Sequence, residues 1–334
     1  MKKKLLLFAS MVILVSVYSQ PRGLKTTGAG PSAHLLWVVP PGLVNTISLG
    51  AVIKAKASSA DNTILQIGTM PDTPLQGPYA LVAGGSKGIG YAIAEALARR
   101  GYNLVLIARH LDSLYSAKNI LESTYGIHVE LLAYDLAKEE TADIITKWCT
   151  DRNIQLKILC NVAGFGGARD YLSLPLDTLR YMVRLNIEST MAVTLSLLPL
   201  LEKNAPSYIL NVASMAGFAP IPIKNLYSAT KSAVVFFSYS LHYQLKKKHI
   251  SVSCLAPGPV FTKPEIREDT KKKLGWIGMK MAVSPERVGE IAVRETLNKK
   301  LIIVPGSLAK ISAFFIRLLP RRWIVALYGR VGDK

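Results

Sequence analysis

Short apolar runs alternate with longer amphipathic stretches from residue 77 onward, and this alternation limits the fold more than any other feature of the sequence. It is typical of repeated βαβ units, in which a parallel sheet is buried between layers of helices. Strands are expected at residues 79–83, 103–108, 128–135, 157–164, 207–214 and 251–257. Helices are expected at residues 91–101, 111–125, 140–152, 176–203 and 226–248. We therefore predict one doubly wound α/β domain over residues 77–305.

A glycine-rich loop, AGGSKGIG at residues 83–90, joins the first expected strand to the first expected helix. Its spaced glycines allow a tight turn and let a ligand approach the backbone, and the helix that follows presents free N–H groups to a phosphate. Such turns also occur for structural reasons, so the loop alone leaves both interpretations open. The residues expected to contact a dinucleotide here are Gly84, Ser86, Lys87, Gly88, Ile89 and Gly90.

The residues after the second expected strand indicate which dinucleotide the loop would hold. NAD sites place an Asp or Glu there, whereas NADP sites place cations near the additional 2′-phosphate. The sequence reads Ala108-Arg109-His110 at this point, without a carboxylate, and Lys87 lies within the glycine loop. Arg109 and Lys87 together favour NADP(H).

Tyr227 and Lys231 lie four residues apart in an expected helix, which places them on one face, a turn away from each other. A free tyrosine is a poor acid or base at neutral pH, and a neighbouring ammonium lowers its pKa by favouring the phenolate. Ser214 lies at the end of an expected strand, where ligands bind in this fold, and can donate a hydrogen bond to a substrate oxygen. These three residues predict acid–base chemistry at the carboxyl ends of the strands.

Seven signals in sequence order resemble the short-chain dehydrogenase/reductase family, over about residues 77–305. They are AGGSKGIG (83–90), Asp135, NVAG (161–164), Asn186, NVASMAG (211–217), YSATK (227–231) and PGPVFT (257–262). The resemblance implies a Rossmann-type fold, an NADP(H) cofactor and an oxidoreductase acting on CH–OH and C=O groups. Ala83 and Val162 depart from the family pattern, which usually has Thr and Asn at these positions.

The resemblance also implies roles for individual residues. Tyr227 would protonate the carbonyl oxygen while Ser214 orients that oxygen. Lys231 would lower the tyrosine pKa and hold the nicotinamide ribose, and Asn186 would hold a water in a proton relay behind Lys231. The further cofactor contacts that it implies are Arg109, Asp135, Leu136, Asn161, Gly164, Pro257, Gly258, Val260 and Thr262.

The segment after the PG motif, residues 263–288, would cover the substrate in this family. Its apolar anchors suit a hydrophobic substrate; they are Trp276, Ile277, Met279 and Met281. The C-terminal tail and residues 227–238 are similar to the branch that holds very-long-chain 3-oxoacyl-CoA reductases, 3-ketosphinganine reductases and hydroxysteroid dehydrogenases. We therefore expect NADPH-dependent reduction of a lipid-like ketone to an alcohol. The alternative is a non-catalytic, membrane-tethered NADP(H)-binding protein on the same fold.

Both ends of the chain are basic and apolar, which suggests attraction to a membrane surface. Residues 1–20 are expected to be a signal peptide or a membrane anchor, and residues 21–76 a linker with a second hydrophobic run at 35–53. The tail at residues 306–334 could pack against the domain or a partner, or lie in a membrane interface. Its apolar residues at helical spacing are Ile311, Phe314, Phe315, Leu318 and Leu319.

Composition excludes several classes of protein. An apolar content of 50% and a charged content of 19% exclude global disorder. The cysteines Cys149, Cys160 and Cys254 lie far apart in apolar runs, which indicates buried thiols and neither disulfides nor a metal site. The net charge of +19 comes without any nucleic-acid recognition motif, so nucleic acid is not an expected partner.

The expected location and assembly follow from the same features. We expect a membrane-associated protein with its catalytic domain in the cytosol. The endoplasmic reticulum, or export after cleavage of residues 1–20, are the alternatives. The resemblance implies a homodimer or homotetramer formed through the helices at residues 176–203 and 226–248.

Overall fold

The structure is a computed structural model that describes residues 54–56, 64–66, 77–166, 172–262, 279 and 282–332. The predictions for residues 1–20 and 35–53 lie outside the described residues, as do those for Trp276, Ile277 and Met281. Within the segment expected as a linker, β1 (Lys54–Lys56) and β2 (Ile64–Gln66) pair as a short antiparallel ribbon.

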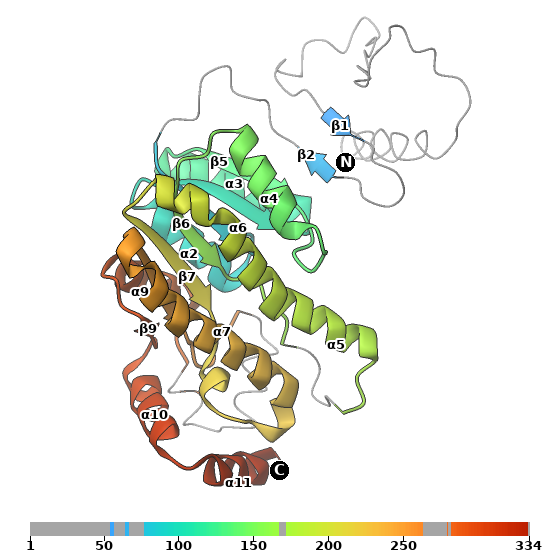
Figure 1. Cartoon of the computed structure of the whole chain (residues 1–334), viewed down its shortest axis with the longest axis vertical. Helices are drawn as coiled ribbons and strands as arrows, with labels where there is room; N and C mark the ends of the chain where they lie inside the picture. The colour runs from blue at the N-terminus through green and yellow to red at the C-terminus, as the bar shows by residue number, and fades with distance from the viewer. Residues whose placement is uncertain are drawn as a thin grey trace, which may run out of the picture. The chain divides into compact units, whose positions relative to one another are not determined.

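A seven-stranded parallel sheet forms the centre of the domain (Figure 1). Its strands are β3 (Tyr79–Ala83), β4 (Asn103–Ala108), β5 (Val129–Ala133), β6 (Leu156–Asn161), β7 (Ser207–Val212), β8 (Ile250–Leu255) and β9 (Ile302–Ile303). Their spatial order is β5-β4-β3-β6-β7-β8-β9, so the strand order reverses between β3 and β6. In doubly wound sheets ligands bind at such a switch point, beyond the carboxyl ends of the strands. The predicted Rossmann-type α/β fold is confirmed.

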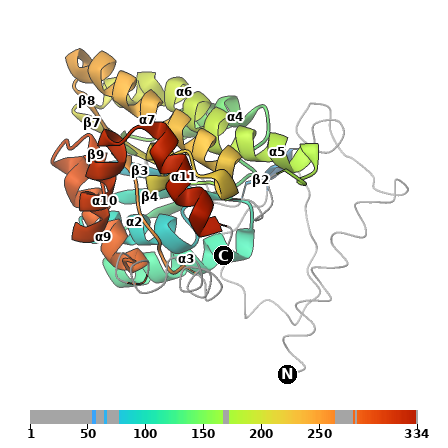
Figure 2. The same ribbon diagram turned by 90° about the horizontal axis from the view of Figure 1, so that it is seen from below.

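Helices cover both faces of the sheet. The helices are α2 (Gly88–Ala98), α3 (Leu111–Tyr125), α4 (Thr141–Asp151), α5 (Leu176–Val183), α6 (Ser189–Lys203), α7 (Asn225–Leu245), α9 (Pro285–Leu297), α10 (Ser307–Leu318) and α11 (Arg321–Gly332). Figure 2 shows α4, α6 and α7 on one side of the strands and α2, α3 and α9 on the other. In β3, Leu81 faces the first group and Val82 the second. Burial on both faces explains why the strands read as continuous apolar runs.

Four predicted strands differ from the structure near the carboxyl edge of the sheet. The strands expected at 128–135, 157–164, 207–214 and 251–257 each end two or three residues early. Those residues leave the sheet and form loops at the predicted site. The helix expected at 176–203 contains a π-helical turn, Arg184–Glu188, between α5 and α6.

Helix α9 was not predicted, although its start carries a recognisable signal. Ser284 caps the helix by accepting a hydrogen bond from the Arg287 N–H at 3.3 Å, and Pro285 occupies the first turn. The helix packs against α2, where a Cβ on Gly289 would collide with the backbone of Ala92. Only glycine therefore allows this close approach of the two helices.

Two further sequence-based predictions concern the cysteines and the C-terminal tail. Cys149, Cys160 and Cys254 are free and buried, as predicted. The tail forms α10 and α11, separated at Leu319-Pro320, where the extended backbone before the proline ends α10. Among the residues that the structure describes, no helix is both long and apolar enough to span a bilayer.

Candidate active site

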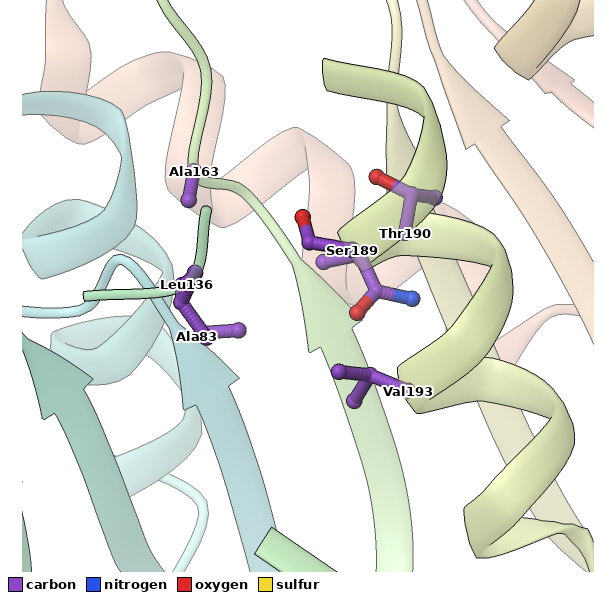
Figure 3. A pocket seen from close by; sticks show the side chains of 7 residues that line it. Ala83, Leu136, Ala163, Ser189, Thr190 and Val193 are labelled. Carbon is purple, nitrogen blue, oxygen red and sulfur yellow. The ribbon is translucent and has the colours of Figure 1, made fainter. Parts of the chain in front are cut away.

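A small pocket lies beside the end of β3, at the point where the strand order reverses (Figure 3). Ser189, Thr190 and Val193 reach it from α6, opposite Ala83 and Leu136. The predicted contact Asn161 also lines it. Leu136 and Asn161 therefore meet at the switch point, as a site in this fold requires.

The glycine loop is packed too closely to accept side chains. A Cβ on Gly84, which has φ +94°, would lie 2.7 Å from the Ala163 nitrogen, and a Cβ on Gly90 would collide with the Gly84 carbonyl oxygen. Helix α2 begins at Gly88, so the positive end of its dipole faces the loop. Glycine backbone beside a helix N-terminus fits the pyrophosphate of a dinucleotide. Ser86 and Ile89 lie half-buried in this loop.

Asn186 connects the loop after β6 to α7. It is fully buried in the π-helical turn, and its Oδ1 accepts a hydrogen bond from the Phe165 N–H at 2.7 Å. Its Nδ2 donates to the Phe165 carbonyl at 2.9 Å and to Thr230 Oγ1 at 3.1 Å. The bond to Thr230 places the asparagine beside the turn of α7 that carries Lys231. π-Helical turns of this kind are frequent at functional sites.

Three predicted residues converge where β7 ends and α7 begins: Ser214, Tyr227 and Lys231. Ser214 follows β7, and its Oγ accepts a hydrogen bond from the Ala216 N–H at 3.1 Å. A hydrogen bond from Ser214 also reaches the Tyr227 hydroxyl. Lys231 Nζ donates to the Val212 carbonyl at 2.8 Å and lies 6.0 Å from the centroid of the Tyr227 ring. A Cβ on Gly164 would lie only 3.1 Å from Lys231 Nζ, so the loop after β6 closes over the ammonium.

Burial and Ser214 act in opposite directions on the pKa of Tyr227. Burial raises the pKa of the phenol, and the hydrogen bond from Ser214 acts in the opposite direction. The lowering expected from Lys231 stays a prediction; the ammonium here donates to the Val212 carbonyl and stands over the Tyr227 ring. Burial also lowers the pKa of Lys231, to about 8.

The depressed pKa of Lys231 predicts a pH dependence of stability. The pKa falls from 10.5 to about 8 on folding, so the unfolded chain binds more protons between these values. The free energy of unfolding should therefore rise with pH in this window. Between pH 7.5 and 9.5, the free energy of unfolding of the wild-type chain should rise by about 2 kcal/mol more than that of Lys231→Met, as measured by urea unfolding. The exposed Lys247→Met is the control, and an equal slope in all three proteins would contradict the prediction.

Arg109, Asp135 and Tyr181 form a chain of hydrogen bonds that the sequence did not reveal. Arg109 Nη1 donates to the Tyr181 hydroxyl at 2.9 Å, and that hydroxyl donates to Asp135 Oδ1 at 3.4 Å. The Tyr181 ring also makes an edge contact with Phe165, at 5.9 Å between centroids. Tyr181 thus links both predicted contacts to the loop after β6. Nothing in the local sequence around α5 indicates this role.

A buried polar network supports the floor of the site. Asn161 Nδ2 donates to Thr194 Oγ1 at 2.8 Å and to Asn211 Oδ1 at 2.9 Å. Asn211 Nδ2 continues to Ser238 Oγ at 3.0 Å. Thr194 was not predicted, but its spacing of eight residues from Asn186, with Thr190 between them, gives a polar stripe on one helix face that could have revealed it.

Backbone hydrogen bonds join the loops at Ala83 and Val162, where the sequence departs from the family pattern. The Ala83 carbonyl accepts from the Val162 and Ala163 N–H groups at 2.9 and 2.8 Å. The ends of β3 and β6 are therefore held together without a threonine or asparagine side chain at these two positions.

The PG segment lies beside both halves of the site. The Pro257 carbonyl accepts a hydrogen bond from the Met215 N–H at 3.0 Å, next to Ser214. A Cβ on Gly88 would lie 3.2 Å from Thr262 Cγ2, so the segment also packs on the glycine loop. Val260 is buried between them, and Gly258 is half-buried. The structure thus brings the predicted Pro257, Gly258, Val260 and Thr262 to the same edge as the other site residues.

Comparison with known families agrees with this geometry. The family model described as short chain dehydrogenase matches residues 78–273. The chain belongs to the short-chain dehydrogenase family. The matched segment includes the glycine loop and the proposed acid–base residues: Asn186, Ser214, Tyr227 and Lys231.

Two curated members of the family illustrate its relationship to this chain. The very-long-chain 3-oxoacyl-CoA reductase of Mus musculus is 34% identical over 194 residues, which cover 57% of this chain and 62% of the mouse protein. Very-long-chain 3-oxoacyl-CoA reductase-A of Danio rerio is 34% identical over 206 residues, covering 60% and 64%. The chain therefore spans slightly less than two thirds of the length of these relatives.

Solved structures of the family share the fold. L-Sorbose reductase from Gluconobacter frateurii, complexed with NADPH and L-sorbose, is 26% identical with a TM-score of 0.62, over 71% of this chain and 98% of that one. A 7beta-hydroxysteroid dehydrogenase is 19% identical with a TM-score of 0.68, over 76% and 98%. The second likeness concerns the fold alone.

Proposed function

We propose that the protein is an NADPH-dependent reductase that converts the keto group of a hydrophobic, lipid-like substrate to an alcohol. The observation that carries this proposal is the convergence of Ser214, Tyr227 and Lys231 near the glycine loop. Asn186 holds the loop after β6, which lies between these residues and the glycine loop. A non-catalytic nucleotide-binding protein would need the glycine loop but not the buried acid–base group.

Each site residue has its own role in the proposed reaction. NADPH, when bound, supplies the hydride that adds to the carbonyl carbon. Tyr227, protonated at neutral pH as any phenol of ordinary pKa is, donates its phenolic proton to the carbonyl oxygen. Ser214 donates a hydrogen bond to the same oxygen. Lys231, with a pKa of about 8, is mostly protonated near pH 7 and can return a proton toward Tyr227.

The family relatives and the site both support a lipid-like substrate. The named relatives are very-long-chain 3-oxoacyl-CoA reductases. A Cβ added at Gly166 would lie 4.0 Å from Tyr227 Cε2, so this loop borders the proton donor. The side chain of Phe165, the preceding residue, is 36% exposed. An exposed apolar ring in the loop that borders Tyr227 suits a 3-oxoacyl chain, 3-ketosphinganine or a ketosteroid.

We also propose that the protein is a membrane-associated homodimer or homotetramer. Apolar side chains on the outer faces of α6 and α7 support self-association, because they are exposed in the single chain: Leu195, Phe236 and Tyr243. These helices belong to the segments that the sequence suggested as subunit contacts.

A substrate panel tests the proposed activity. We would follow NADPH and NADH oxidation by the purified full chain with 3-oxoacyl-CoAs, 3-ketosphinganine and ketosteroids, and identify the alcohol by mass spectrometry. The expected result is turnover with NADPH and one of these classes. Tight NADPH binding without reduction of any of these ketones would instead favour the non-catalytic alternative.

The hydrogen bond between Arg109 and Tyr181 leads to a prediction about the preference for NADPH over NADH. Tyr181→Phe removes the hydroxyl that holds the Arg109 guanidinium, so NADPH affinity should fall about 3- to 10-fold while NADH affinity stays unchanged. Fluorescence titration of both cofactors measures this, with Arg109→Ala expected to lose more. Equal weakening of both cofactors would show that Tyr181 acts through Asp135 on the fold and not on Arg109.

A further inference from the structure

Helix α10 carries two apolar faces, of which one faces the domain. Ala309 and Ala313 are fully buried, and Ile316 packs beside them against a cluster that includes Phe218 and Val235. This inner face is built from small residues at a spacing of four. This face makes the contact between α10 and the domain.

The outer face of α10 carries the larger residues. Ile311, Phe314, Phe315 and Leu318 follow the spacing i, i+3, i+4, i+7, and they are 55%, 57%, 55% and 65% exposed. We call these four residues the outer stripe. This spacing normally marks the side of a helix that is buried. On α11, Trp323 is likewise 58% exposed, while Ile324 is buried. An exposed apolar group of this kind marks an interaction surface.

Basic side chains accompany the outer stripe, and no acidic residue occurs between residues 299 and 332. Arg317 stacks on the Phe218 ring at 4.8 Å, and Arg321 donates to the Phe218 carbonyl, so two cations hold the tail against the domain. Lys310 and Arg322 are exposed. Within the described part of the chain, no carboxylate forms an ion pair with either of them.

We infer that the outer stripe, with Trp323, Lys310 and Arg322, is a docking surface for an anionic lipid bilayer, on which α10 lies in the interfacial plane. Phenylalanine, tryptophan and leucine beside lysine and arginine are the composition of helices that lie in this interface. Each cation near an anionic surface strengthens the attraction. A second copy of this surface fits less well, because it would bring the same uncompensated cations together.

The docking surface lies next to the proposed active site. Helix α10 packs against the short 3-10 helix Met215–Phe218, which follows Ser214, and α11 packs against Pro222–Lys224, which precedes Tyr227. A bilayer bound here would therefore border the substrate side of the domain. The inference deepens the proposed membrane association and does not depend on the proposed reaction, so failure of either can be recognised separately.

A fluorescent label on α10 tests the inference in the full chain. We would label Phe315→Cys with bimane and add vesicles of phosphatidylcholine, with or without phosphatidylserine. The native thiols are buried with pKa values raised to about 12, 12 and 11, so the new cysteine reacts selectively. Ile120→Cys, on α3, is the matched control because Ile120 is 52% exposed.

The inference predicts a blue shift at position 315 with anionic vesicles and none at position 120. Lys310→Gln with Arg322→Gln should raise the half-maximal vesicle concentration roughly 30-fold. Four results would overturn the inference. They are no vesicle binding, binding without a shift at position 315, an equal shift with phosphatidylcholine alone, and a shift without vesicles that grows with protein concentration. The last would assign the surface to a second copy of the chain.

Discussion

Tyr227→Phe is expected to lower ketone turnover by about 10²- to 10⁴-fold, the usual contribution of a positioned general acid. The phenol is half-buried at the end of the site and receives a hydrogen bond from Ser214. Phenylalanine keeps the ring and its packing but removes the only proton that this side chain can donate. Steady-state rates with the substrate found in the panel measure the effect.

The binding of NADPH should be unaffected by this change, which separates chemistry from cofactor binding. Fluorescence titration of NADPH should give the same affinity for wild type and Tyr227→Phe. Tyr115→Phe is the control, because Tyr115 lies on α3, packs on the other side of the sheet and should retain full turnover. Turnover within threefold of wild type in Tyr227→Phe would mean that another group supplies the proton.

Gly90→Ala is expected to cause the largest loss of both stability and cofactor affinity among changes in the glycine loop. Its new Cβ would collide with the Gly84 carbonyl oxygen, so the loop must move away from the start of α2. Overpacking of this kind costs about 1 to 3 kcal/mol of unfolding free energy. NADPH affinity should fall at least tenfold, because the N–H groups of the loop and helix would no longer converge on the pyrophosphate.

Gly329→Ala is the matched control for this prediction. Gly329 lies in helix α11, and a Cβ there would meet nothing within 4 Å. Because alanine favours helix more than glycine does, this change should leave stability equal or slightly higher. Urea unfolding and NADPH titration of both variants provide the comparison. Unchanged NADPH affinity in Gly90→Ala would show that the pyrophosphate does not bind at this loop.

Local patterns were enough to predict six of the seven strands, and the family resemblance supplied most of the site contacts. Continuous apolar runs identify buried parallel strands, and the residues that follow each strand meet at one edge of the sheet. Ser214, Asn161 and the glycine loop could therefore be placed together without coordinates. Tyr181 could not, because it reaches Arg109 and Asp135 only through the position of α5 in three dimensions.

The pKa of Tyr227 illustrates a second limit. A spacing of four residues predicts that Lys231 lies on the same helix face, which it does, but the effect on pKa depends on where the ammonium points and how deeply the phenol is buried. The two faces of α10 show the same limit. Its apolar spacing predicted an amphipathic helix, but only the structure shows that alanines face the domain while the phenylalanines do not.

The contact between α2 and α9 has a consequence for synthesis of the protein. Helix α2 follows the first strand of the domain, whereas α9, whose Gly289 fits against Ala92, comes close to its end. At about 5 to 20 residues per second, translation of the roughly 190 intervening residues takes on the order of 10 to 40 s. During that time the apolar side of α2 has no α9 to cover it. Helix α2, which follows the glycine loop, therefore gains its packing partner α9 only as translation of the domain finishes.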